Sequence, residues 1–528
     1  MGKITKYLNQ LIVGNVFDTP EILEQYSTDQ SILKIKPRFV AFPESTDDIR
    51  KLMRFFNQIA SKDIPVTVAV RGSGMDEGGA DLSTGLVIST EKLNKMLEID
   101  PRERLVRVQA GITLKELNTA LSVSGLTIPI GGHDNDTIGG LISNCPTDSF
   151  AGKYGGIQKY VERIEVILAN GEVLQTIRYR KYAAAKKTAE KSLEGDIYRR
   201  IAKLIKKNES LINSISKDEY ECSGYPKIKD VYKRESMDLA PVFFGAQGTL
   251  GVISEVILKA VPVSKKPVRV VATFKTLEQA CDFMDDAKEL KPCEMNVYDL
   301  KIIQEARESG KNLDGVIRKL EDGFVIFLSF DEKKNACLKK LELMRKKYPR
   351  NAKFILESPE NQSTLNEFQN SLSNYLGNIR DGERVPVLTD FYLPAENLEY
   401  FMKDLEILST KLELDLALYG SYGSSIYSLR PKFNLKSEDY NKKMATFLRA
   451  GAYVIERQGG KLAGGTPEGR LKAVVTNTEM REPEKNLYTE IKRIFDQNNT
   501  LGPDIKLGAV SKFTLTHLRD TNLPKIML

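Results

Sequence analysis

Glycine is the feature that most constrains this chain, because it gathers in three short segments that each border an apolar run. The segments are 70–90, 127–144 and 243–258, and the first, VRGSGMDEGGADLSTGLVIST, contains five glycines. A glycine loses more conformational freedom on folding than other residues, so a cluster needs a reason. The usual reason is backbone that adopts positive φ angles and lets another group lie directly against the peptide plane.

The first glycine loop differs from the fingerprint of nicotinamide dinucleotide folds, which is G-x-G-x-x-G between a strand and a helix. Glu77 occupies the place of the third glycine, and the apolar stretch 64–70 is followed by a second strand at 86–89 rather than by a helix. Without a helix N-terminus, the remaining anion site is a nest of backbone N–H groups. Taken alone, the loop is equally compatible with a glycine-rich hairpin that binds nothing.

Further short elements surround these loops. Residues 97–126 predict a strand, a turn, a second strand and an amphipathic helix from Thr113, and residues 154–176 predict a β-hairpin with the turn signal Asn170–Gly171. The third glycine loop opens another strand. Three glycine loops beside short strands indicate one extended binding cleft, which a cofactor with a pyrophosphate and two flat rings would fill.

Residues 37–263 resemble the FAD-binding domain of the vanillyl-alcohol-oxidase and p-cresol-methylhydroxylase (PCMH) superfamily, in the branch that contains D-lactate dehydrogenases and the glycolate oxidase D subunit. Five motifs carry the resemblance in order: PRFVAFPESTDDIRKLM (37–53), RGSGMDEGGA (71–80), VQAGITLKEL (108–117), TIGGLISN (137–144) and GAQGTLGVISE (245–255). The resemblance implies an FAD cofactor whose pyrophosphate is cradled by the loop at 71–80.

The same motifs imply which residues bind FAD: Arg71, Gly72, Ser73, Gly74, Met75, Asp76, Gly79, Gly132, Thr137, Gly139, Gly140, Asn144, Gly248, Gly251, Val252 and Ile253. Relatives that bond the flavin covalently through this loop carry histidine where this chain has Met75, so we predict non-covalent FAD. Two alternatives stay open. His133 could sit near the flavin, although a polar loop histidine is favoured, and Cys145 could form a thioether.

The metal centre that the branch implies is missing. Its D-2-hydroxy-acid dehydrogenases carry G-H-x-G-D-G-N-x-H and G-E-H-G-x-G, which supply three ligands to a divalent metal and a histidine base. Here these motifs read GSYGSSIYS (420–428) and GGTPEG (464–469), so the ligands and base are replaced by Ser421, Ser428, Gly465 and Thr466. A neutral hydroxyl cannot substitute for an imidazole ligand. We predict that no metal is bound.

Two residues are candidates for the chemistry. Relatives have an I-R-E arginine that pairs with the substrate carboxylate, and the stretch 378–394 places Arg380 there with Arg384 close by. The fork of arginine suits a carboxylate, although a surface arginine in a charged loop is an alternative. Glu468 is the carboxylate that remains in the second motif, and it is a candidate acid or base. A core role is favoured for the tyrosines of the first motif, Tyr419, Tyr422 and Tyr427.

The second half predicts a cap domain in which amphipathic helices cover one face of an antiparallel sheet. The expected strands are 268–274, 323–330, 352–357, 385–394 and a hairpin within 414–431, and the expected helices are 276–290, 332–347 and 395–410. The fold class is therefore α+β, with a PCMH-type FAD-binding domain of two α+β subdomains and a cap. The predicted divisions are 1–36 (lead-in), 37–264 (FAD-binding domain), 265–475 (cap) and 476–528 (a segment returning to the FAD-binding domain).

Composition narrows the partners. The net charge of +7 comes from 78 basic and 71 acidic residues mixed along the chain of 528, and the basic stretch 177–192 lacks the aromatic residues of a nucleic-acid groove. Five cysteines without a C-x-x-C pair fit a reducing compartment, so we expect a cytoplasmic protein with no iron–sulfur cluster. No apolar run is long enough for a spanning helix.

Three functions follow from these observations. The favoured one is an FAD-dependent oxidoreductase that oxidises a small hydroxy acid or alcohol by hydride transfer without a metal, for an electron acceptor of unknown identity. The second is a flavin-binding subunit or pseudoenzyme that works within a complex and lacks the catalytic metal site. The third, a metal-dependent D-2-hydroxy-acid dehydrogenase with relocated ligands, is disfavoured because the chain has only two histidines.

Overall fold

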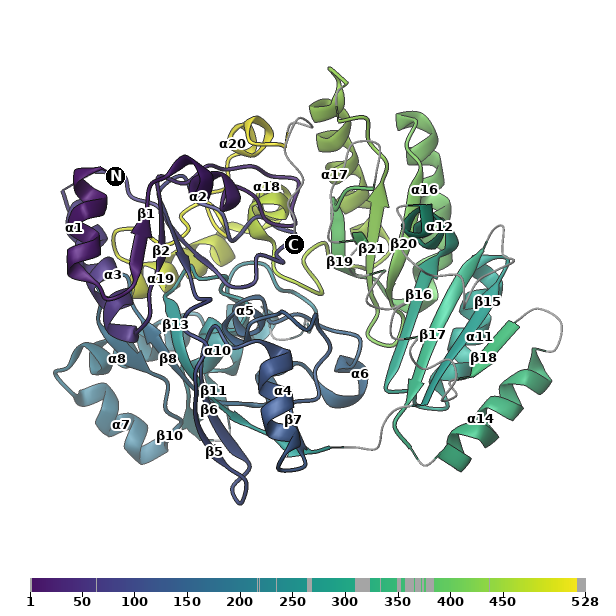
Figure 1. Cartoon of the computed structure of the whole chain (residues 1–528), viewed down its shortest axis with the longest axis horizontal. Coiled ribbons are helices and arrows are strands. Elements are labelled where there is room, and N and C mark those ends of the chain that lie inside the picture. Colours follow the sequence, from purple (N-terminus) through teal and green to yellow (C-terminus); the bar gives the residue numbers. More distant parts are fainter. Residues whose placement is uncertain are drawn as a thin grey trace.

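The computed structural model describes most of the chain. The described residues are 2–62, 64–215, 217, 219–233, 235–263, 268–308, 323–332, 334–348, 353–356, 365, 372, 375, 376, 384–435 and 437–519. Figure 1 shows two lobes, with the first half of the chain in one and the later strands and helices in the other, while the C-terminal helices return to the first lobe.

A small mixed sheet begins the first lobe. Its strand order is β1-β2-β4-β3, in which β1 is antiparallel to β2 while β2 and β3 both run parallel to β4. Its elements are α1 (Lys3–Leu11), β1 (Asn15–Phe17), α2 (Pro20–Gln25), β2 (Phe39–Phe42), α3 (Thr46–Ala60), β3 (Val68–Arg71) and β4 (Leu86–Ser89). Because β3 and β4 are parallel, the first glycine loop is a crossover between them, and the alternative of a plain hairpin is excluded.

A five-stranded antiparallel sheet of order β5-β6-β13-β8-β9 forms the centre of this lobe. The strands are β5 (Met96–Asp100), β6 (Leu105–Gln109), β8 (Val161–Ile167), β9 (Val173–Gln175) and β13 (Val252–Lys259). The predicted strand pair, the helix capped by Thr113 and the hairpin at Asn170–Gly171 are confirmed. β13 enters the middle of the sheet from far along the chain, and this brings the third glycine loop beside the other two.

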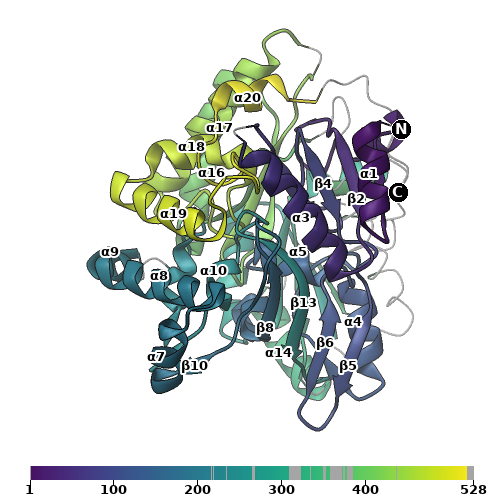
Figure 2. The ribbon, with the colours of Figure 1, turned by 90° about the vertical axis from the view of Figure 1, so that its left-hand side faces the viewer.

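Helices and short strands cover this sheet, as Figure 2 shows from the side. The helices are α4 (Leu114–Ser122), α5 (Ile138–Asn144), α6 (Ala151–Tyr154), η1 (Ile157–Lys159), α7 (Lys181–Ala189), α8 (Leu193–Lys207), α9 (Glu209–Ile215), η2 (Pro226–Asp230) and α10 (Ala240–Phe243). The short strands are β7 (Leu126–Thr127), β10 (Tyr179–Arg180), β11 (Tyr232–Lys233), β12 (Ser236–Met237) and β14 (Val261–Pro262). The basic stretch 177–192 is mostly the exposed helix α7.

The second lobe is built on a seven-stranded antiparallel sheet of order β18-β15-β17-β16-β20-β21-β19. Its strands are β15 (Val268–Phe274), β16 (Glu294–Asp299), β17 (Phe324–Phe330), β18 (Lys353–Leu356), β19 (Leu388–Tyr392), β20 (Leu416–Ser421) and β21 (Ile426–Pro431). Its helices are α11 (Leu277–Lys288), α12 (Leu300–Glu308), α14 (Lys334–Lys347), η3 (Ala395–Asn397), α16 (Leu398–Leu412) and α17 (Tyr440–Arg457). β16, α12 and α17 were not anticipated from the sequence.

The expectation that helices cover only one face of this sheet is wrong. Along β15, Val270 and Ala272 join a core with α11, α14, α16 and α17, while the intervening Val271 joins a second core with α12. Alternate residues of a strand point to opposite faces, so both faces are buried. The sequence signal for the second face was weak because α12 is short and follows β16 directly.

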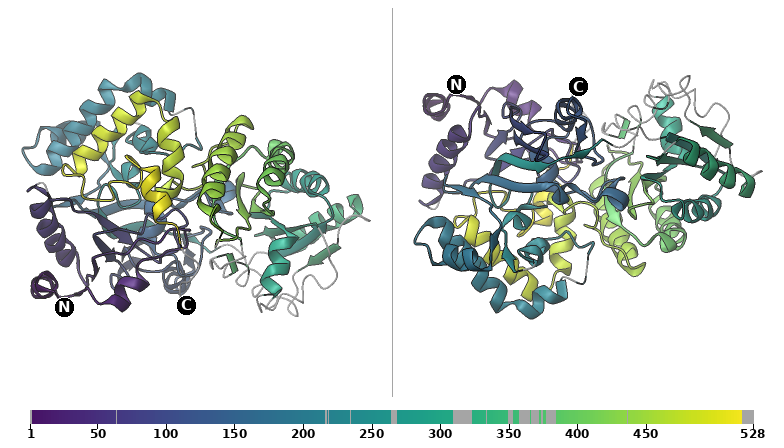
Figure 3. Two further views of the ribbon diagram at one scale, coloured as in Figure 1. Left: turned by 90° about the horizontal axis from the view of Figure 1, so that it is seen from above. Right: turned by 90° about the horizontal axis from the view of Figure 1, so that it is seen from below.

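The C-terminal segment returns to the first lobe through α18 (Gly469–Glu479), α19 (Glu482–Phe495) and α20 (Ser511–Thr516). Val68 N donates to Thr500 O at 2.9 Å and Gly502 N donates to Val68 O at 2.8 Å, so the tail adds backbone bonds to β3. The ammonium of Lys492 donates to Thr249 O at 2.6 Å, beside the third glycine loop. Figure 3 shows these helices lying over the first lobe, next to the second.

Candidate functional site

A cavity lies where the two sheets of the first lobe meet. All three glycine loops reach it, together with the ends of strands from both sheets. Its lining residues are Val70, Gly72, Ala80, Asp81, Thr90, Ala110, Gly139, Gly140, Ser143, Asn144, Gln247, Gly248, Gly251 and Ile253. As expected from the sequence, the three glycine loops line one common cavity.

Several positions in this cavity must be glycine, because neighbouring segments approach the backbone too closely to leave room for a side chain. A Cβ at Gly139 would lie 2.8 Å from Ala110 Cβ, and one at Gly140 would lie 2.9 Å from Thr137 Oγ1. A Cβ at Gly72 would overlap that same hydroxyl, while one at Gly251 would overlap Val166. Contacts this short do not occur, so only bare backbone fits along this wall, and the peptide planes stay open to a bound group.

The carboxyl group of Asp76 orders the first glycine loop, and that of Asp81 stands directly after the loop. Asp76 Oδ2 accepts from Gly78 N at 3.1 Å and Ala80 N at 2.7 Å, while Asn144 Nδ2 donates to Asp76 Oδ1 at 3.4 Å. Burial raises the pKa of Asp76 and raises that of Asp81 well above its ordinary value. The uncharged form of Asp81 is therefore favoured at the cavity wall, which suits an anionic ligand better than a carboxylate would.

The structure brings seven of the sixteen predicted FAD residues to the cavity wall: Gly72, Gly139, Gly140, Asn144, Gly248, Gly251 and Ile253. The other nine are Arg71, Ser73, Gly74, Met75, Asp76, Gly79, Gly132, Thr137 and Val252. Several of these make structural contacts: Arg71 lies over the Tyr26 ring, Met75 Sδ accepts from Gln30, and Thr137 caps α5.

Seven lining residues were missed from the sequence: Val70, Ala80, Asp81, Thr90, Ala110, Ser143 and Gln247. Five of them, Ala80, Asp81, Ala110, Ser143 and Gln247, stand within or beside quoted motifs, so motif position could have found them. Val70 lies in β3 and Thr90 directly follows β4, and their approach to the other glycine loops depends on how the two sheets pack.

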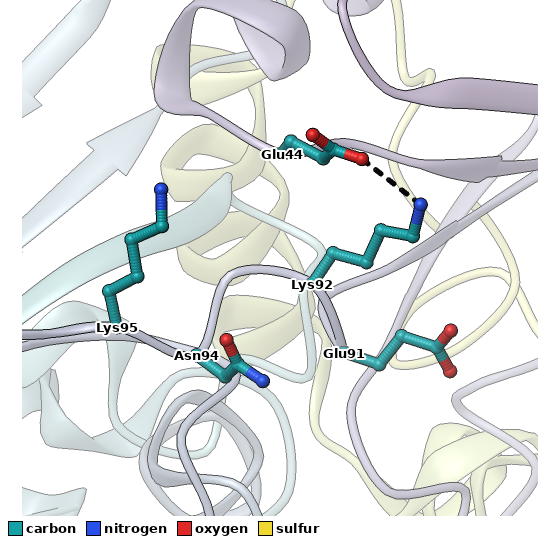
Figure 4. A pocket seen from close by; sticks show the side chains of 5 residues that line it. All are labelled: Glu44, Glu91, Lys92, Asn94 and Lys95. Atoms are coloured by element: carbon teal, nitrogen blue, oxygen red, sulfur yellow. Dashed lines mark hydrogen bonds and ion pairs between the residues drawn. The ribbon is translucent and has the colours of Figure 1, made fainter.

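A separate surface hollow is lined by the charged and polar side chains of Glu44, Glu91, Lys92, Asn94 and Lys95 (Figure 4). Lys92 Nζ lies 3.0 Å from Glu44 Oε1, so this ammonium is already paired within the hollow. The glycine-lined cavity, and not this hollow, carries the predicted motifs.

The two segments that stand in place of the metal-binding motifs, 420–428 and 464–469, come together at β19, the edge strand of the second sheet. Ser428 Oγ donates to Asp390 Oδ1 at 3.2 Å, and Thr466 Oγ1 donates to Asp390 Oδ2 at 3.3 Å. A Cβ at Gly465 would lie 2.5 Å from Ile426 Cγ2 and 2.8 Å from Asp390 O, so no side chain fits there. Within the described residues, no group of three or more His, Cys, Asp or Glu side chains could hold a metal ion.

Lys472 lies in this cluster although it is almost fully buried. Its ammonium donates to Thr389 O at 3.2 Å, Thr466 O at 3.4 Å and Thr466 Oγ1 at 3.2 Å. Burial lowers the pKa of Lys472, and the nearby carboxylates of Asp390 and Glu468 partly oppose that effect. Sequence reasoning missed both Asp390 and Lys472.

A buried ion pair joins the two lobes. The guanidinium of Arg430, on β21, bonds to the carboxylate of Glu77 in the first glycine loop, and Arg430 Nε also donates to Tyr419 Oη at 3.2 Å. Burial raises the pKa of Glu77 to about 7, outweighing the attraction of Arg430. The other two motif tyrosines, Tyr422 and Tyr427, pack in the core of the second lobe, as predicted.

This raised pKa predicts a pH-dependent stability. Between the ordinary value of 4.5 and about 7, the folded protein holds a proton on Glu77 that the unfolded chain has lost. The free energy of unfolding should therefore fall as pH rises through this window. Glu77→Gln should remove that part of the fall, which urea unfolding on either side of the window would measure. If the free energy of unfolding changed with pH in the same way in the wild type and in Glu77→Gln, the raised pKa of Glu77 would be contradicted.

Glu468 occupies a structural position. It is fully buried, with Oε1 accepting from Gly224 N at 2.8 Å and Oε2 accepting from Lys506 Nζ at 2.8 Å. Lys506 is likewise fully buried. Both carboxylate oxygens are engaged, and Glu468 does not line the cavity, so its geometry favours a tie between the C-terminal segment and the first lobe over a role as acid or base.

Arg380 lies outside the described residues, but its neighbour Arg384 is placed. The Arg384 guanidinium is 1% exposed and forks between Glu305 Oε2 at 3.0 Å and Asp415 Oδ2 at 2.6 Å. It also donates to Asp415 O and Arg430 O. These contacts use its donors within the second lobe, so Arg384 is not available to a substrate carboxylate.

Arg384→Met should therefore lower stability and not substrate affinity. Losing this buried guanidinium removes its hydrogen bonds to charged groups, which are worth about 1.5–3 kcal/mol each, while Glu305 keeps Lys432 and Asp415 keeps Lys301 as ion-pair partners. Urea unfolding should show this loss, while Arg345→Met, on the exposed side of α14, should change stability little. A folded Arg384→Met protein with normal stability but a raised KM would contradict this expectation.

The two residues considered for covalent attachment are also placed. His133 is exposed, and its backbone N–H donates to Asp136 Oδ2 at 2.8 Å. Cys145 is a free, buried thiol at the end of α5, and burial raises its pKa to about 12. Because a thiolate is the reactive form of cysteine, this environment disfavours a thioether.

Two known sequence families match the chain. The family described as "FAD binding domain" matches residues 37–177, and the family described as "FAD linked oxidases, C-terminal domain" matches residues 264–505. The first covers β2 to β9 of the first lobe, with the first two glycine loops. The second covers the cap sheet and extends into the returning C-terminal segment.

Similar proteins include three curated relatives. A D-2-hydroxyglutarate dehydrogenase from Pseudomonas putida is 24% identical over 90% of this chain and 49% of its own length. A D-lactate dehydrogenase from Archaeoglobus fulgidus is 24% identical over 91% of this chain and 95% of its own. A glycolate oxidase subunit from Bacillus subtilis is 23% identical over 88% of both chains. The chain thus spans about half the length of the first relative.

Solved structures share the fold. The 4-ethylphenol oxidase from Gulosibacter chungangensis superposes with a TM-score of 0.67 at 14% identity, covering 92% of this chain and 93% of the oxidase. p-Cresol methylhydroxylase superposes with a TM-score of 0.65 at 13% identity, covering 95% of each chain. This likeness supports an α+β PCMH-type fold with an antiparallel cap sheet.

Proposed function

The chain belongs to the FAD-linked oxidases and its cofactor is FAD, and from this premise we propose that it oxidises a small hydroxy acid or alcohol without a metal. The observation that carries the proposal is the glycine-walled cavity between the two sheets of the first lobe. The relatives named for D-lactate, D-2-hydroxyglutarate and glycolate support hydroxy acids as the substrate class.

The cavity residues fit FAD. Bare backbone at Gly72, Gly139 and Gly140 leaves room for a pyrophosphate against the peptide planes, and the amides of Asn144 and Gln247 offer polar contacts beside it. When bound, FAD supplies the acceptor for a hydride from the substrate carbon. The chain's own residues bind and orient the two molecules and receive the hydroxyl proton. Met75 in the first loop supports non-covalent attachment.

Independence from metal rests on the positions of the altered motifs. Gly465 has no room for a glutamate side chain, and Ser428 is committed to Asp390. A relocated metal centre is disfavoured because the described residues offer no group of three suitable ligands.

We also propose the domain divisions 1–36, 37–264, 265–475 and 476–528. They are supported by separate hydrophobic cores in the two lobes and by the return of residues beyond 476 to the first lobe. A small-molecule substrate is the supported partner, and the electron acceptor and any partner subunit stay predictions. Cytoplasmic location is a prediction from cysteine usage, while the described residues contain no helix long and apolar enough to cross a membrane.

A second function, a flavin-binding subunit without its own oxidation chemistry, is favoured by the loss of the metal ligands at Ser421, Ser428 and Gly465. An anaerobic visible spectrum of the FAD-loaded protein, before and after D-lactate, glycolate or D-2-hydroxyglutarate, separates the two. Bleaching of the flavin band by one donor supports the enzyme. A band that only dithionite bleaches supports the subunit, and no flavin band after incubation with FAD would exclude both.

A further inference from the structure

The cluster at β19 carries an inference that deepens the proposed function and rests on it. Three groups stand in a row: Lys472 Nζ donates to Thr466 Oγ1 at 3.2 Å, and Thr466 Oγ1 donates to Asp390 Oδ2 at 3.3 Å. Ser428 Oγ holds the other oxygen of Asp390 at 3.2 Å. The two side chains that replace a ligand and the base of the metal motifs thus both donate to one carboxylate.

The backbone of Asp390 is held in an unusual conformation. Its φ is 48°, in the left-handed region, at an irregularity in the pairing of β19 with β21. Asp390 N donates to Ser428 Oγ at 2.9 Å, and Gly465 N donates to Asp390 O at 2.7 Å. A left-handed aspartate in a strand costs free energy, and such strain collects at functional sites. At this irregularity the Asp390 carboxylate contacts Ser428 and Thr466, one from each altered motif.

Asp390 and Thr466 are the half-buried residues of this cluster, whereas Ser428 and Lys472 are 1% and 2% exposed. A carboxylate has about four acceptor positions, and Ser428 and Thr466 occupy one on each oxygen. Asp390 can therefore accept a further hydrogen bond from a hydroxyl group that enters from the lobe boundary.

The row lies next to the glycine-lined cavity. α18, which carries Lys472, begins with Gly469 N donating to the cavity residue Gln247 at 3.1 Å. Leu471 N, one residue before Lys472, donates to Gly78 O of the first glycine loop at 3.1 Å. Figure 1 shows α18 between β19 and the first lobe. The carboxylate and the cavity are thus joined by one helix and one loop.

We propose that Asp390 accepts the hydroxyl proton of the substrate, and that Thr466 and Lys472 position Asp390 and balance its charge in place of a metal. The substrate O–H bond breaks and its proton goes to Asp390, while its electron pair forms the second C–O bond. The C–H bond breaks with its electron pair, which leaves as a hydride to FAD. Asp390 touches substrate in this step, and Thr466 and Lys472 act through it.

Charged groups from several elements surround the row. Lys472 and Arg430 are cations close to Asp390. The other titratable groups near the row are Glu77 and Asp76 in the first glycine loop, Tyr419 on β20, Glu468 before α18, and Cys222. Lys472→Met would take a cation away from the Asp390 carboxylate and would remove the hydrogen bond to Thr466 Oγ1.

The test uses FAD-loaded full-length protein and anaerobic rapid mixing with D-lactate, glycolate and D-2-hydroxyglutarate. Asp390→Asn should slow bleaching of the flavin band at least ~100-fold while FAD content is retained, since a general base contributes about 10²–10⁴-fold. Asp415→Asn is the matched control, because Asp415 pairs with Arg384 and Lys301 away from the row, and its rate should stay within about threefold.

A split between rate and affinity tests the positioning residues. Lys472→Met should slow bleaching of the flavin band at saturating donor while the donor concentration for half-maximal rate changes little, because Lys472 acts through Thr466 and Asp390 and does not touch the donor. Lys472→Arg keeps a cation and a donor at this place and should restore the rate. A Lys472→Met protein that bleaches as fast as the wild type would exclude Lys472 as a positioning residue.

The outcomes separate this inference from the proposed function. If donors bleach the flavin band of the wild type but not that of Asp390→Asn, both the proposed function and the role of Asp390 are supported. Bleaching of Asp390→Asn within about fivefold of the wild-type rate would overturn the assignment of Asp390 and leave the proposed function standing. No bleaching of the wild type by any of the three donors would overturn both.

Discussion

Gly72→Val should lower the affinity for FAD at least ~100-fold, a loss of about 2.7 kcal/mol. A Cβ at Gly72 would overlap Thr137 Oγ1. That hydroxyl accepts from Gly140 N at 3.2 Å and caps α5, so it cannot move away without releasing the start of the helix. The valine must then project toward the cavity or displace the second glycine loop. Titration of the apoprotein with FAD, followed by flavin fluorescence, measures the effect.

Gly125→Ala is the matched control for this substitution. Gly125 stands in an exposed turn, and a Cβ there would meet nothing within 4 Å. Its φ of 68° makes alanine cost about 1 kcal/mol of stability, with no path to the cavity. FAD affinity of Gly125→Ala should match that of the wild type. If Gly72→Val bound FAD within about threefold of the wild type, the cavity would not be the pyrophosphate site.

Lys506→Met should lower the free energy of unfolding by about 3–5 kcal/mol. Lys506 and Glu468 are both fully buried, and their charged atoms lie 2.8 Å apart. Removing the ammonium leaves the Glu468 carboxylate buried, with the backbone N–H of Gly224 as its remaining hydrogen-bond donor. Urea unfolding of the full-length protein measures this loss. Lys206→Met, on an exposed position of α8, should change the midpoint little.

A double variant separates a structural role of Glu468 from a chemical one. Glu468→Gln combined with Lys506→Met removes both charges and keeps an acceptor for Gly224 N, so it should recover part of the lost stability. If Glu468 is purely structural, the double variant should also bleach its flavin at close to the wild-type rate once folded. A stable Glu468→Gln protein that fails to bleach would restore Glu468 as an acid or base.

The sequence predicted those secondary-structure elements whose geometry depends on neighbouring residues in the chain. The capped helix at Thr113, the turn at Asn170–Gly171 and the strand at 86–89 were all predicted, because each depends on residues within a few positions. The second face of the cap sheet was not predicted, since α12 buries its apolar residues against strands whose order along the sheet differs from their order in the chain.

The residues of the candidate site also fall into those that the sequence predicted and those that it did not. Glycines at 72, 139, 140, 248 and 251 were found because close approach of backbone leaves a trace in residue type. Asp390 and Lys472 left no such trace. An aspartate before an apolar run and a lysine within a helix are ordinary in sequence, and their meeting at Thr466 depends on an irregularity in β19 and on the direction of α18.

The sequence by itself determined that this chain binds FAD and that the usual metal ligands are absent, because both depend on the identity of residues at motif positions. Only the tertiary structure decided what stands in their place: Glu468 in a buried pair with Lys506, Arg384 enclosed by Glu305 and Asp415, and Asp390 open beside Lys472. The physical reason is that burial and partnership decide whether a charged side chain stabilises the fold or stays free to react, and both are properties of distant residues brought together.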